Sequence, residues 1–458
     1  MLEVDAGSGD SPSLSSDAGA VLKHKNHPPL VRKSLVPGAD AKECDGYEEA
    51  LLNELARREF TVFVLSEAGK PIFASCGSEE QLCSLAALIQ TFVMVVGSWA
   101  DSLIRFRSLK THICFSYRSP LILAIVSRTP FNLESQLDIL YKQVLSTLCR
   151  KQLVGVFQKK GPNFDLRLFL KDSDRHFNEI VYAYRADPCL FLRSVRVFPL
   201  ASSERDFITN AIISAVNSEK ADHLIMGLVV AHRQLVTVVR LKGLALHPFD
   251  LHILLNLVEC NPSFRHAENW VPICLPHFDE SGFVHAFLAY IWPGSAACLI
   301  LLSVERSAFD VLRDVYQSIT ARLMSRPSLQ PAFDNPPTFE LNLANFPDVW
   351  HFIYKNRTSS QLCSSEFRIP YVNEEERRRL LNHYKQTVSF CMQSPSVKHL
   401  FVYRSDNSLV LTTTANYELH CVMSPFVSMS SAVSQIDRLL RALRKEESRF
   451  FITSSSFF

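Results

Sequence analysis

One ordering of apolar segments restricts the fold of this chain more than any other feature. Two runs rich in β-branched and aromatic residues, Phe60–Leu65 and Lys70–Ala74, flank a short loop that contains Gly69. This pattern predicts a β-hairpin. The long apolar segment 81–100 follows the hairpin. Three more strand-like runs then complete the unit, at residues 102–110, 112–117 and 121–127.

The helix that we predict for residues 81–100 is apolar around nearly its whole circumference. Ser78 and Gln81 fit a capping box at its start. A helix that covers one side of a sheet normally shows a single apolar stripe. Three interpretations therefore stay open: a helix buried in its own domain, a helix shared between its own sheet and a partner protein, and a membrane span. The segment approaches the ~20 residues that a span requires, but Gln90 and Ser98 interrupt it.

The order of two strands, a helix and three strands recurs later in the chain, without sequence identity between the copies. The second copy has strand-like runs at 223–230, 234–241, 271–275, 283–290 and 297–303, with a helix at 247–259. The third shows only one strand before its helix, at 349–354, followed by the helix at 374–391 and strands at 398–403, 408–414 and 418–423. Further helices are predicted at 133–148 (capped by Asn132), 151–159, 168–184, 203–217, 308–325 and 427–447.

The fold class that follows is α+β, with three similar domains. We expect domains at residues 58–187, 188–326 and 347–453, a disordered lead-in at 1–57 and a proline-rich linker at 327–346. A chain of 458 residues is long enough for two to four domains. The net charge of +2 gives no overall field toward nucleic acid, and we expect no nucleic-acid partner.

The cysteines indicate a reducing compartment. The chain has 12 of them, spread singly and mostly within apolar runs, and from the acidic, small residues at its start we expect no signal peptide. Scattered cysteines of this kind behave as small apolar residues in a cytosolic protein.

A search for catalytic and cofactor motifs finds little. The chain has 14 glycines and no phosphate-binding loop, nucleophile elbow, dinucleotide-binding fingerprint or zinc-protease motif. Cys260, His266, Cys274 and His277 form the densest Cys/His group, but their spacing matches no standard zinc module. His247 and His252 have no visible nucleophile beside them. We therefore expect no metal, no cofactor and no covalent catalysis.

A basic group ends the third unit. Arg438, Arg441, Arg444 and Lys445 lie on its last predicted helix, with Glu446 and Glu447 close by. These cations could contact anionic lipid headgroups or form an ordinary solvated surface.

Several long motifs resemble the Mon/SAND vacuolar-fusion family. They are the segments 62–73, 119–129, 163–167, 270–276, 279–283, 351–355 and 445–451, which follow the family's order over about residues 58–452. The chain departs from the family pattern after Phe73, in its leader, in the linker after Pro327 and at its carboxyl end.

The resemblance implies three longin-like domains, each a five-stranded antiparallel sheet flanked by helices. It also implies a heterodimer with a Ccz-family protein, joined through the first domain of each. Such a pair exchanges guanine nucleotide on a late-endosomal Rab GTPase of the Rab-seven class, and so drives endosome maturation and vacuole or lysosome fusion. An early-endosomal Rab and an anionic phosphoinositide membrane surface recruit it, so we expect a cytoplasmic protein that binds endosomal and lysosomal membranes peripherally.

An exchange factor of this kind needs a contact surface and no nucleophile. From the resemblance we expect partner or GTPase contacts at Lys70, Ile72, Phe73, Leu85, Ile89, Phe92 and Met94, and lipid contacts at the four basic residues named above. Two alternatives are a longin adaptor or tether that binds a Rab without exchanging its nucleotide, and an unrelated hydrolase whose site depends on long-range geometry.

Overall fold

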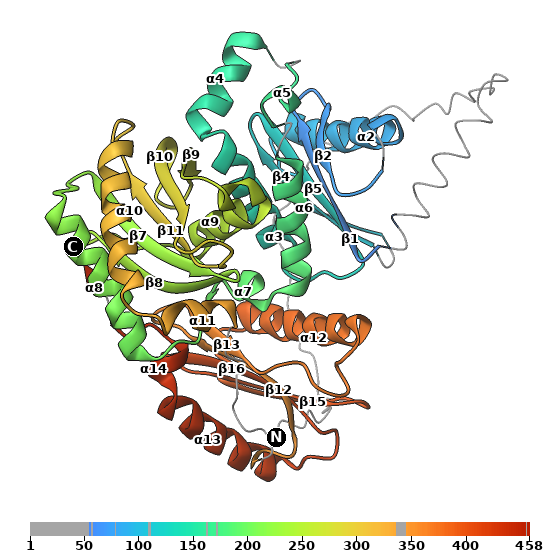
Figure 1. The fold of residues 1–458 in the computed structure, drawn as a ribbon. Helices are drawn as coiled ribbons and strands as arrows, with labels where there is room; N and C mark the ends of the chain where they lie inside the picture. Colours follow the sequence, from blue (N-terminus) through green and yellow to red (C-terminus); the bar gives the residue numbers. More distant parts are fainter. Residues whose placement is uncertain are drawn as a thin grey trace, which may run out of the picture. The chain divides into compact units, whose positions relative to one another are not determined.

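The computed structural model describes Leu55 and residues 58–77, 79–108, 111–161, 164–170, 173–335, 345–454 and 456–458. The expected disorder of the lead-in and the capping box at Ser78 therefore concern residues that lie outside the description. Figure 1 shows three sheets with helices packed against them.

The first domain contains the predicted hairpin, helix and three strands. Its strands are β1 (Phe60–Ser66), β2 (Pro71–Ala74), β3 (Arg105–Ser108), β4 (Thr111–Arg118) and β5 (Leu121–Ser127). Its helices are α2 (Glu79–Ser98), α3 (Leu133–Thr147), α4 (Arg150–Lys160), α5 (Arg167–Leu170) and α6 (Asp174–Ala186). The strands form an antiparallel sheet in the order β2-β1-β5-β4-β3.

Both faces of this sheet are buried, which explains why its central strands are apolar without interruption. Successive side chains of a strand point to opposite faces. Accordingly, Phe63 and Leu65 of β1 pack with α2, whereas Val62 and Val64 pack on the side of α3 and α6.

The second domain repeats this plan. It contains β7 (Leu224–Ala231), β8 (Gln234–Arg240), α9 (Pro248–Cys260), the short 3-10 helix η1 (Pro262–Arg265), β9 (Asn269–Leu275), β10 (Asp279–Tyr290) and β11 (Cys298–Ser303). The helices α8 (Ser202–Ser218), α10 (Phe309–Met324) and α11 (Leu329–Asp334) cover one face of the sheet, and α9 covers the other.

The third domain contains β12 (Val349–Asn356), β13 (Gln361–Ser364), α12 (Glu374–Gln393), β14 (His399–Tyr403), β15 (Ser408–Thr413) and β16 (Tyr417–Met423). Its last helices are α13 (Met429–Lys445) and α14 (Glu447–Phe450). The side of the sheet under α12 belongs to the same apolar core as α3 and α6, so the first and third domains share a core.

Two short strands join the second and third sheets to distant parts of the chain. After the turn of helix α7 (Pro188–Phe191), β6 (Val195–Arg196) pairs in parallel with β13 of the third domain. Near the carboxyl end, β17 (Ser456–Phe457) pairs in parallel with β8 of the second domain. The expected five-stranded antiparallel sheets are thus present, and two of them gain a sixth, parallel strand.

Three local predictions differ from the structure. The helix predicted at 168–184 is two helices, α5 and α6. The expected linker contains α11, because Leu329 and Phe333 are fully buried in the core of the second domain. Asn132 precedes α3, but its backbone is left-handed (φ 54°) and its side chain makes no capping hydrogen bond.

A buried guanidinium ties the end of the third domain to the second. Arg205 of α8 donates five hydrogen bonds to backbone oxygens, those of Phe198, Val236, Ser448, Arg449 and Phe451, at 2.7–3.4 Å. These use all five N–H donors of an arginine. Burial lowers the pKa of Arg205 to about 10, so the group remains charged at neutral pH.

Replacing Arg205 by methionine keeps a similar volume but leaves those five carbonyl groups, three of them in buried hydrogen bonds, without their donor. We expect Arg205→Met to lower the free energy of unfolding by roughly 3 kcal/mol, measured by urea denaturation. The exposed Arg306, replaced in the same way, provides the control and should change stability little. Equal stability of the two variants would show that the hydrogen bonds of Arg205 contribute nothing to the free energy of unfolding.

Two buried histidines lie in the third domain, on β12 and β16. Burial is the main cause that lowers the pKa of both His351 and His420 to about 3. The ring of His351 forms a hydrogen bond of 2.9 Å with the hydroxyl of Tyr384, and the ring of His420 meets Tyr384 edge-on.

Because these pKa values are lower in the folded state than the unfolded value of 6.5, protonation favours the unfolded chain. The contribution of the neutral histidines to the free energy of unfolding is therefore complete above pH 6.5. It is lost as the pH falls from 6.5 toward 3. Replacing His420 by phenylalanine should therefore make the protein lose about 2 kcal/mol less stability between pH 7.5 and pH 5. Urea denaturation at the two pH values measures this, and the same replacement at the exposed His266 is the control.

Candidate partner-binding surface

Helix α2 is held against its sheet by one narrow side. Leu82, Ala86, Ile89 and Val93 are buried, at the helical spacing i, i+4, i+7 and i+11. The helix is also fixed to the β1–β2 turn, where the side chain of Gln90 donates a 2.9 Å hydrogen bond to the backbone oxygen of Glu67. Gly69 permits this close approach, since its φ is +78° and a Cβ there would lie 3.1 Å from Gln90.

A second apolar side of α2 is open to solvent. Leu88, Phe92, Val95 and Trp99 have the same spacing as the buried set and are all exposed, Trp99 to 72%. We call these four residues the α2 stripe. Contiguous apolar side chains on a surface mark interaction sites more often than single ones do. The helix therefore gives part of its apolar surface to its own sheet and leaves another part uncovered.

The opposite flank of α2 borders a cavity of about 670 Å³ at the edge of the sheet. Met94 and Ser98 of the helix line it together with Ile104 and with Tyr117 of β4. We call this the β3 cavity. Strand β3 is the last strand of its sheet, so its outer edge can offer backbone hydrogen bonds to another chain.

Charges of both signs line the β3 cavity, namely Asp101, Glu134 and Arg118, and further basic residues follow along strand β3. Arg105 and Arg107 alternate with the exposed Phe106 along β3. Burial lowers the pKa of the neighbouring His112, and the two arginines add to this effect. Arg105 pairs with Glu134 at 3.0 Å. The hydroxyl of Tyr117 donates to Glu67, which is the main cause that raises the pKa of Tyr117.

The structure separates the predicted contact residues into two groups. Lys70, Phe92 and Met94 are exposed, and Leu85 is half-buried on the sheet side of α2. Ile72, Phe73 and Ile89 are buried, with Ile89 only 4% exposed. The prediction that these three contact a partner needs correction, because they pack inside the domain and support the surface from below.

The sequence reasoning also missed residues of the surface. Leu88, Val95, Trp99, Ile104, Phe106 and Tyr117 are exposed and were not chosen. The spacing of Leu88, Phe92, Val95 and Trp99 was a usable signal, but the helix offered two apolar sides and the sequence did not show which one faces the sheet.

The four basic residues of α13 lie on its solvent face. Arg438, Arg441, Arg444 and Lys445 are exposed, whereas Ile436, Leu439, Leu440 and Leu443 fill the core of the third domain. Exposed apolar side chains precede them at Phe426, which is 94% exposed, and at Met429 and Val433. Their role as a lipid contact stays a prediction.

The histidines and cysteines considered for chemistry have structural neighbours. His247 accepts the backbone N–H of Phe249 at the start of α9, and the ring of His252 meets the oxygen of Ser194 at 2.8 Å. The Cys260 thiol donates to the side chain of Asn256, and burial raises its pKa to about 11. Nine of the eleven described cysteines are buried.

Two further findings concern the alternatives left open by the sequence. Within the described ranges, no helix is long and apolar enough to cross a membrane. Within the same ranges, no group of three or more His, Cys, Asp or Glu side chains is placed to hold a metal ion.

Comparison with known families gives a match over each domain. Residues 60–180 match the first longin domain of FUZ, MON1 and HPS1, residues 222–321 match the second, and residues 348–447 match the third. The three domains described above are therefore longin domains.

Individual relatives match over most of the chain. The bovine (Bos taurus) protein named vacuolar fusion protein MON1 homolog A is 35% identical over 415 residues, which is 89% of this chain and 74% of that protein. The chicken (Gallus gallus) homolog A is 36% identical over 85% of this chain and 71% of its own length. The vacuolar fusion protein MON1 of the yeast Yarrowia lipolytica is 30% identical over 86% of this chain and 74% of that protein.

The different burial of Ile89 on α2 and of Trp99, the residue directly after its end, gives a direct test of the surface. Trp99→Asp places a charge in solvent, so it should change the free energy of unfolding by less than about 0.5 kcal/mol. Ile89→Asp buries an unpaired charge and should lower it by more than about 3 kcal/mol. Thermal and urea denaturation measure both. Comparable destabilisation by the two variants would mean that the stripe is covered within this chain.

Proposed function

Because this chain belongs to the MON1 family of vacuolar fusion proteins, we propose that it acts in membrane fusion at the vacuole or lysosome. More specifically, we propose that it is one subunit of a heterodimeric guanine-nucleotide exchange factor. The second subunit would be a Ccz-family protein, and the substrate a late-endosomal Rab GTPase of the Rab-seven class.

The open side of α2 is the observation that carries this proposal. A helix whose stripe of Leu88, Phe92, Val95 and Trp99 is uncovered suits a partner that presents its own apolar surface. Large aromatic side chains such as Phe92 and Trp99 are the residue types that dominate binding energy when an interface buries them. The β3 cavity lies on the other flank of the same helix, so one helix could contact two proteins.

Nucleotide exchange requires no bond-forming residue in the exchange factor. The factor needs only to bind the nucleotide-free GTPase more tightly than the nucleotide-bound form, because a ligand shifts an equilibrium by its difference in affinity for the two states. Moving a switch loop away from the nucleotide weakens the phosphate and Mg²⁺ contacts. A surface with apolar residues, a cavity and the basic residues Arg105 and Arg107 can provide such binding.

We further propose that α13 contributes to recruitment by a membrane. Its exposed Arg438, Arg441, Arg444 and Lys445 carry four positive charges along one helix, and Asp437 is the acidic residue of the same helix. Clustered cations attract anionic headgroups such as phosphoinositides, by about 1 kcal/mol for each Lys or Arg near the surface. An early-endosomal Rab would be the protein recruiter.

The test is the release of fluorescent GDP from the Rab in the presence of this protein and its Ccz-family partner. We expect the complex to accelerate release, and we expect Trp99→Asp together with Phe92→Asp to lower that acceleration at least about tenfold by weakening the heterodimer. Val311→Asp is the matched control, since Val311 is an exposed apolar residue on α10 of the second domain.

The outcomes separate the exchange factor from the adaptor or tether. If the complex forms and binds the Rab but GDP release is unchanged, the protein is a longin adaptor or tether. If the complex forms equally well with the double variant, the α2 stripe is not the heterodimer contact, although exchange activity could still be measured with the unaltered protein.

A further inference from the structure

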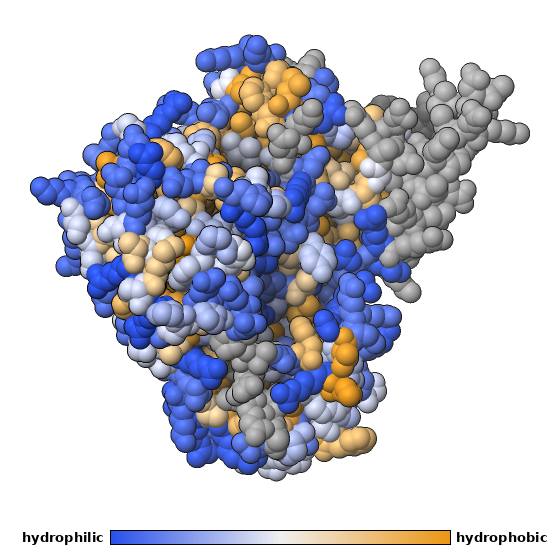
Figure 2. Space-filling model, viewed as in Figure 1, coloured by the Kyte–Doolittle hydropathy of each residue, from blue (hydrophilic) through white to orange (hydrophobic). Residues whose placement is uncertain are grey.

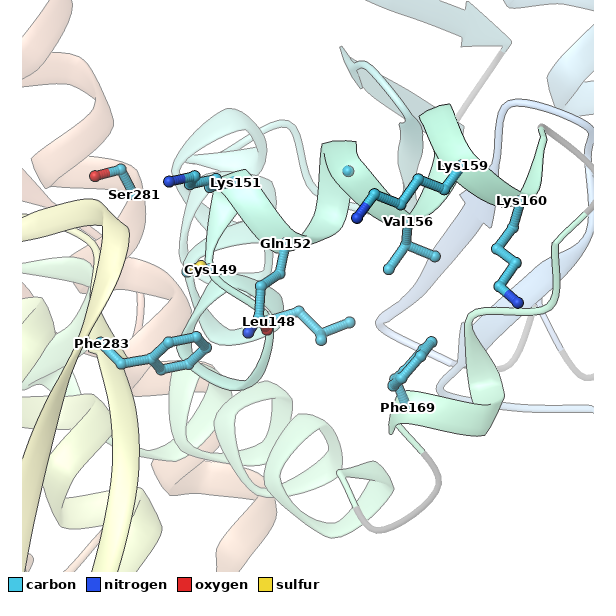
Figure 3. Close-up of a pocket in the computed structure, with 11 residues that line it drawn as sticks. Leu148, Cys149, Lys151, Gln152, Val156, Lys159, Lys160, Phe169, Ser281 and Phe283 are labelled. Carbon is cyan, nitrogen blue, oxygen red and sulfur yellow. The ribbon is translucent and has the colours of Figure 1, made fainter. Parts of the chain in front are cut away.

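A second hollow, which uses no residue of α2 or β3, lies between the first and second domains. Its volume is about 670 Å³. Leu148 and Val156 form part of its wall, and Phe169 of α5 and Phe283 of β10 lie on opposite sides of it (Figure 3). In Figure 2 the region of α4 and α5 shows apolar atoms beside hydrophilic side chains. We call this hollow the α4 groove.

One side of α4 packs against the first domain, and another side faces the groove. Leu153 and Phe157 are buried and hold the helix on the first domain. Gln152, Val156 and Lys159, together with Gly155, line the groove. These four positions have the spacing i, i+3, i+4 and i+7, which places them on one helix face.

Lysines surround the apolar wall. Lys151, Lys159 and Lys160 all line the groove, and no Asp or Glu is among the residues that do. Two carboxylates beside Ser281 already have partners. Glu280 pairs with Arg150 at 2.7 Å, and Asp279 accepts hydrogen bonds from the backbone N–H and the hydroxyl of Ser281 at 2.8 and 2.7 Å. Among the described residues the three lysines form no ion pair.

Gly155 opens a notch between two of these lysines. It lies one helical turn from Lys151 and one turn from Lys159, and an added Cβ would have no heavy atom within 4 Å. A glycine inside a helix is destabilising relative to alanine. Here it leaves the helix backbone accessible from the groove, so another helix can approach closely.

We propose that the α4 groove binds an acidic amphipathic helix of a partner protein. Apolar side chains on one face of that helix would enter the hollow between Phe169 and Phe283, and carboxylates one turn away would lie at Lys151 and Lys159. Charge complementarity requires a negatively charged partner helix, since the charged residues that line the groove are all lysines. In helix-in-groove binding, the bound helix contacts the groove with apolar residues at positions i, i+3, i+4 and i+7.

The shape of the groove distinguishes this partner from a membrane. The apolar wall is recessed in a concave space that has room for several side chains. A bilayer surface binds protruding apolar side chains that insert among its headgroups. The groove also draws on both domains, through Phe169 and Val156 from the first and Phe283 from the second, so the pair of domains forms the site.

The experiment uses the full chain and a fluorescein-labelled peptide about 18 residues long, with leucines at i, i+3, i+4 and i+7 and glutamates elsewhere. A second peptide carries lysine in place of each glutamate. Fluorescence polarisation measures the affinity of each peptide, at low and at high salt. We expect the acidic peptide to bind, the basic peptide to bind at least about tenfold more weakly, and salt to weaken acidic-peptide binding.

Two variants test the location of binding. Gly155→Trp should abolish binding of the acidic peptide by filling the notch, with an unchanged thermal melting temperature because no described residue occupies that space. Lys151→Glu combined with Lys159→Glu should weaken the acidic peptide and strengthen the basic one. This reversal is a gain of binding that misfolding cannot produce. Lys242→Glu combined with Lys398→Glu, at exposed positions elsewhere, is the control for net charge.

Three results would overturn the proposal. One is equal affinity for the acidic and basic peptides, and another is acidic-peptide binding that survives Gly155→Trp. The third is binding to phosphatidylserine vesicles, abolished by Gly155→Trp, without any affinity for the peptide, which would make the groove a lipid site. Nucleotide release by the heterodimer is a separate measurement, so failure here would leave the proposed exchange function untouched.

Discussion

Burial of both faces of each sheet is the constraint on which the rest of this structure depends. A sheet whose strands are apolar on both sides needs a layer of helices on each face. This chain has three such sheets, and some of its helices pack in a core that two domains share. Helices α6 and α12 meet in one core, which joins the first and third domains. Against that background, the stripe on α2 is unusual, because it is an apolar surface that the described residues leave exposed.

The sequence predicted the order of elements well, since strand and helix periodicities are local properties. It predicted less well which apolar residues are exposed. Ile89 and Phe92 are three positions apart on one helix, yet Ile89 lies in the core and Phe92 lies in solvent. Helix α11 was hidden among prolines, and β6 and β17 are too short to show a pattern. Their positions depend on pairing with strands far away in sequence, which no local reading can supply.

The proposed exchange surface and the α4 groove differ in physical character. The α2 stripe is apolar and convex, and it suits a partner with which it forms an extensive contact. The α4 groove is concave and rimmed by Lys151, Lys159 and Lys160, and it suits a single charged helix whose affinity responds to salt. One protein can therefore hold a stable subunit on one face and a more readily exchanged partner on another.

The placement of β17 has a consequence for how the protein is made. Strand β8 leaves the ribosome long before Ser456 and Phe457 are synthesised, although the two strands are neighbours in the finished sheet. During that interval the edge of β8 exposes unpaired backbone groups. Arg205 can bond to the carbonyl oxygens of Phe198 and Val236, but its partners in the segment 448–451 have not yet been synthesised. The second domain is thus translated early, but its sheet is completed only when β17 pairs with β8. A nascent chain that pauses within the third domain carries an open sheet edge that a chaperone would have to protect.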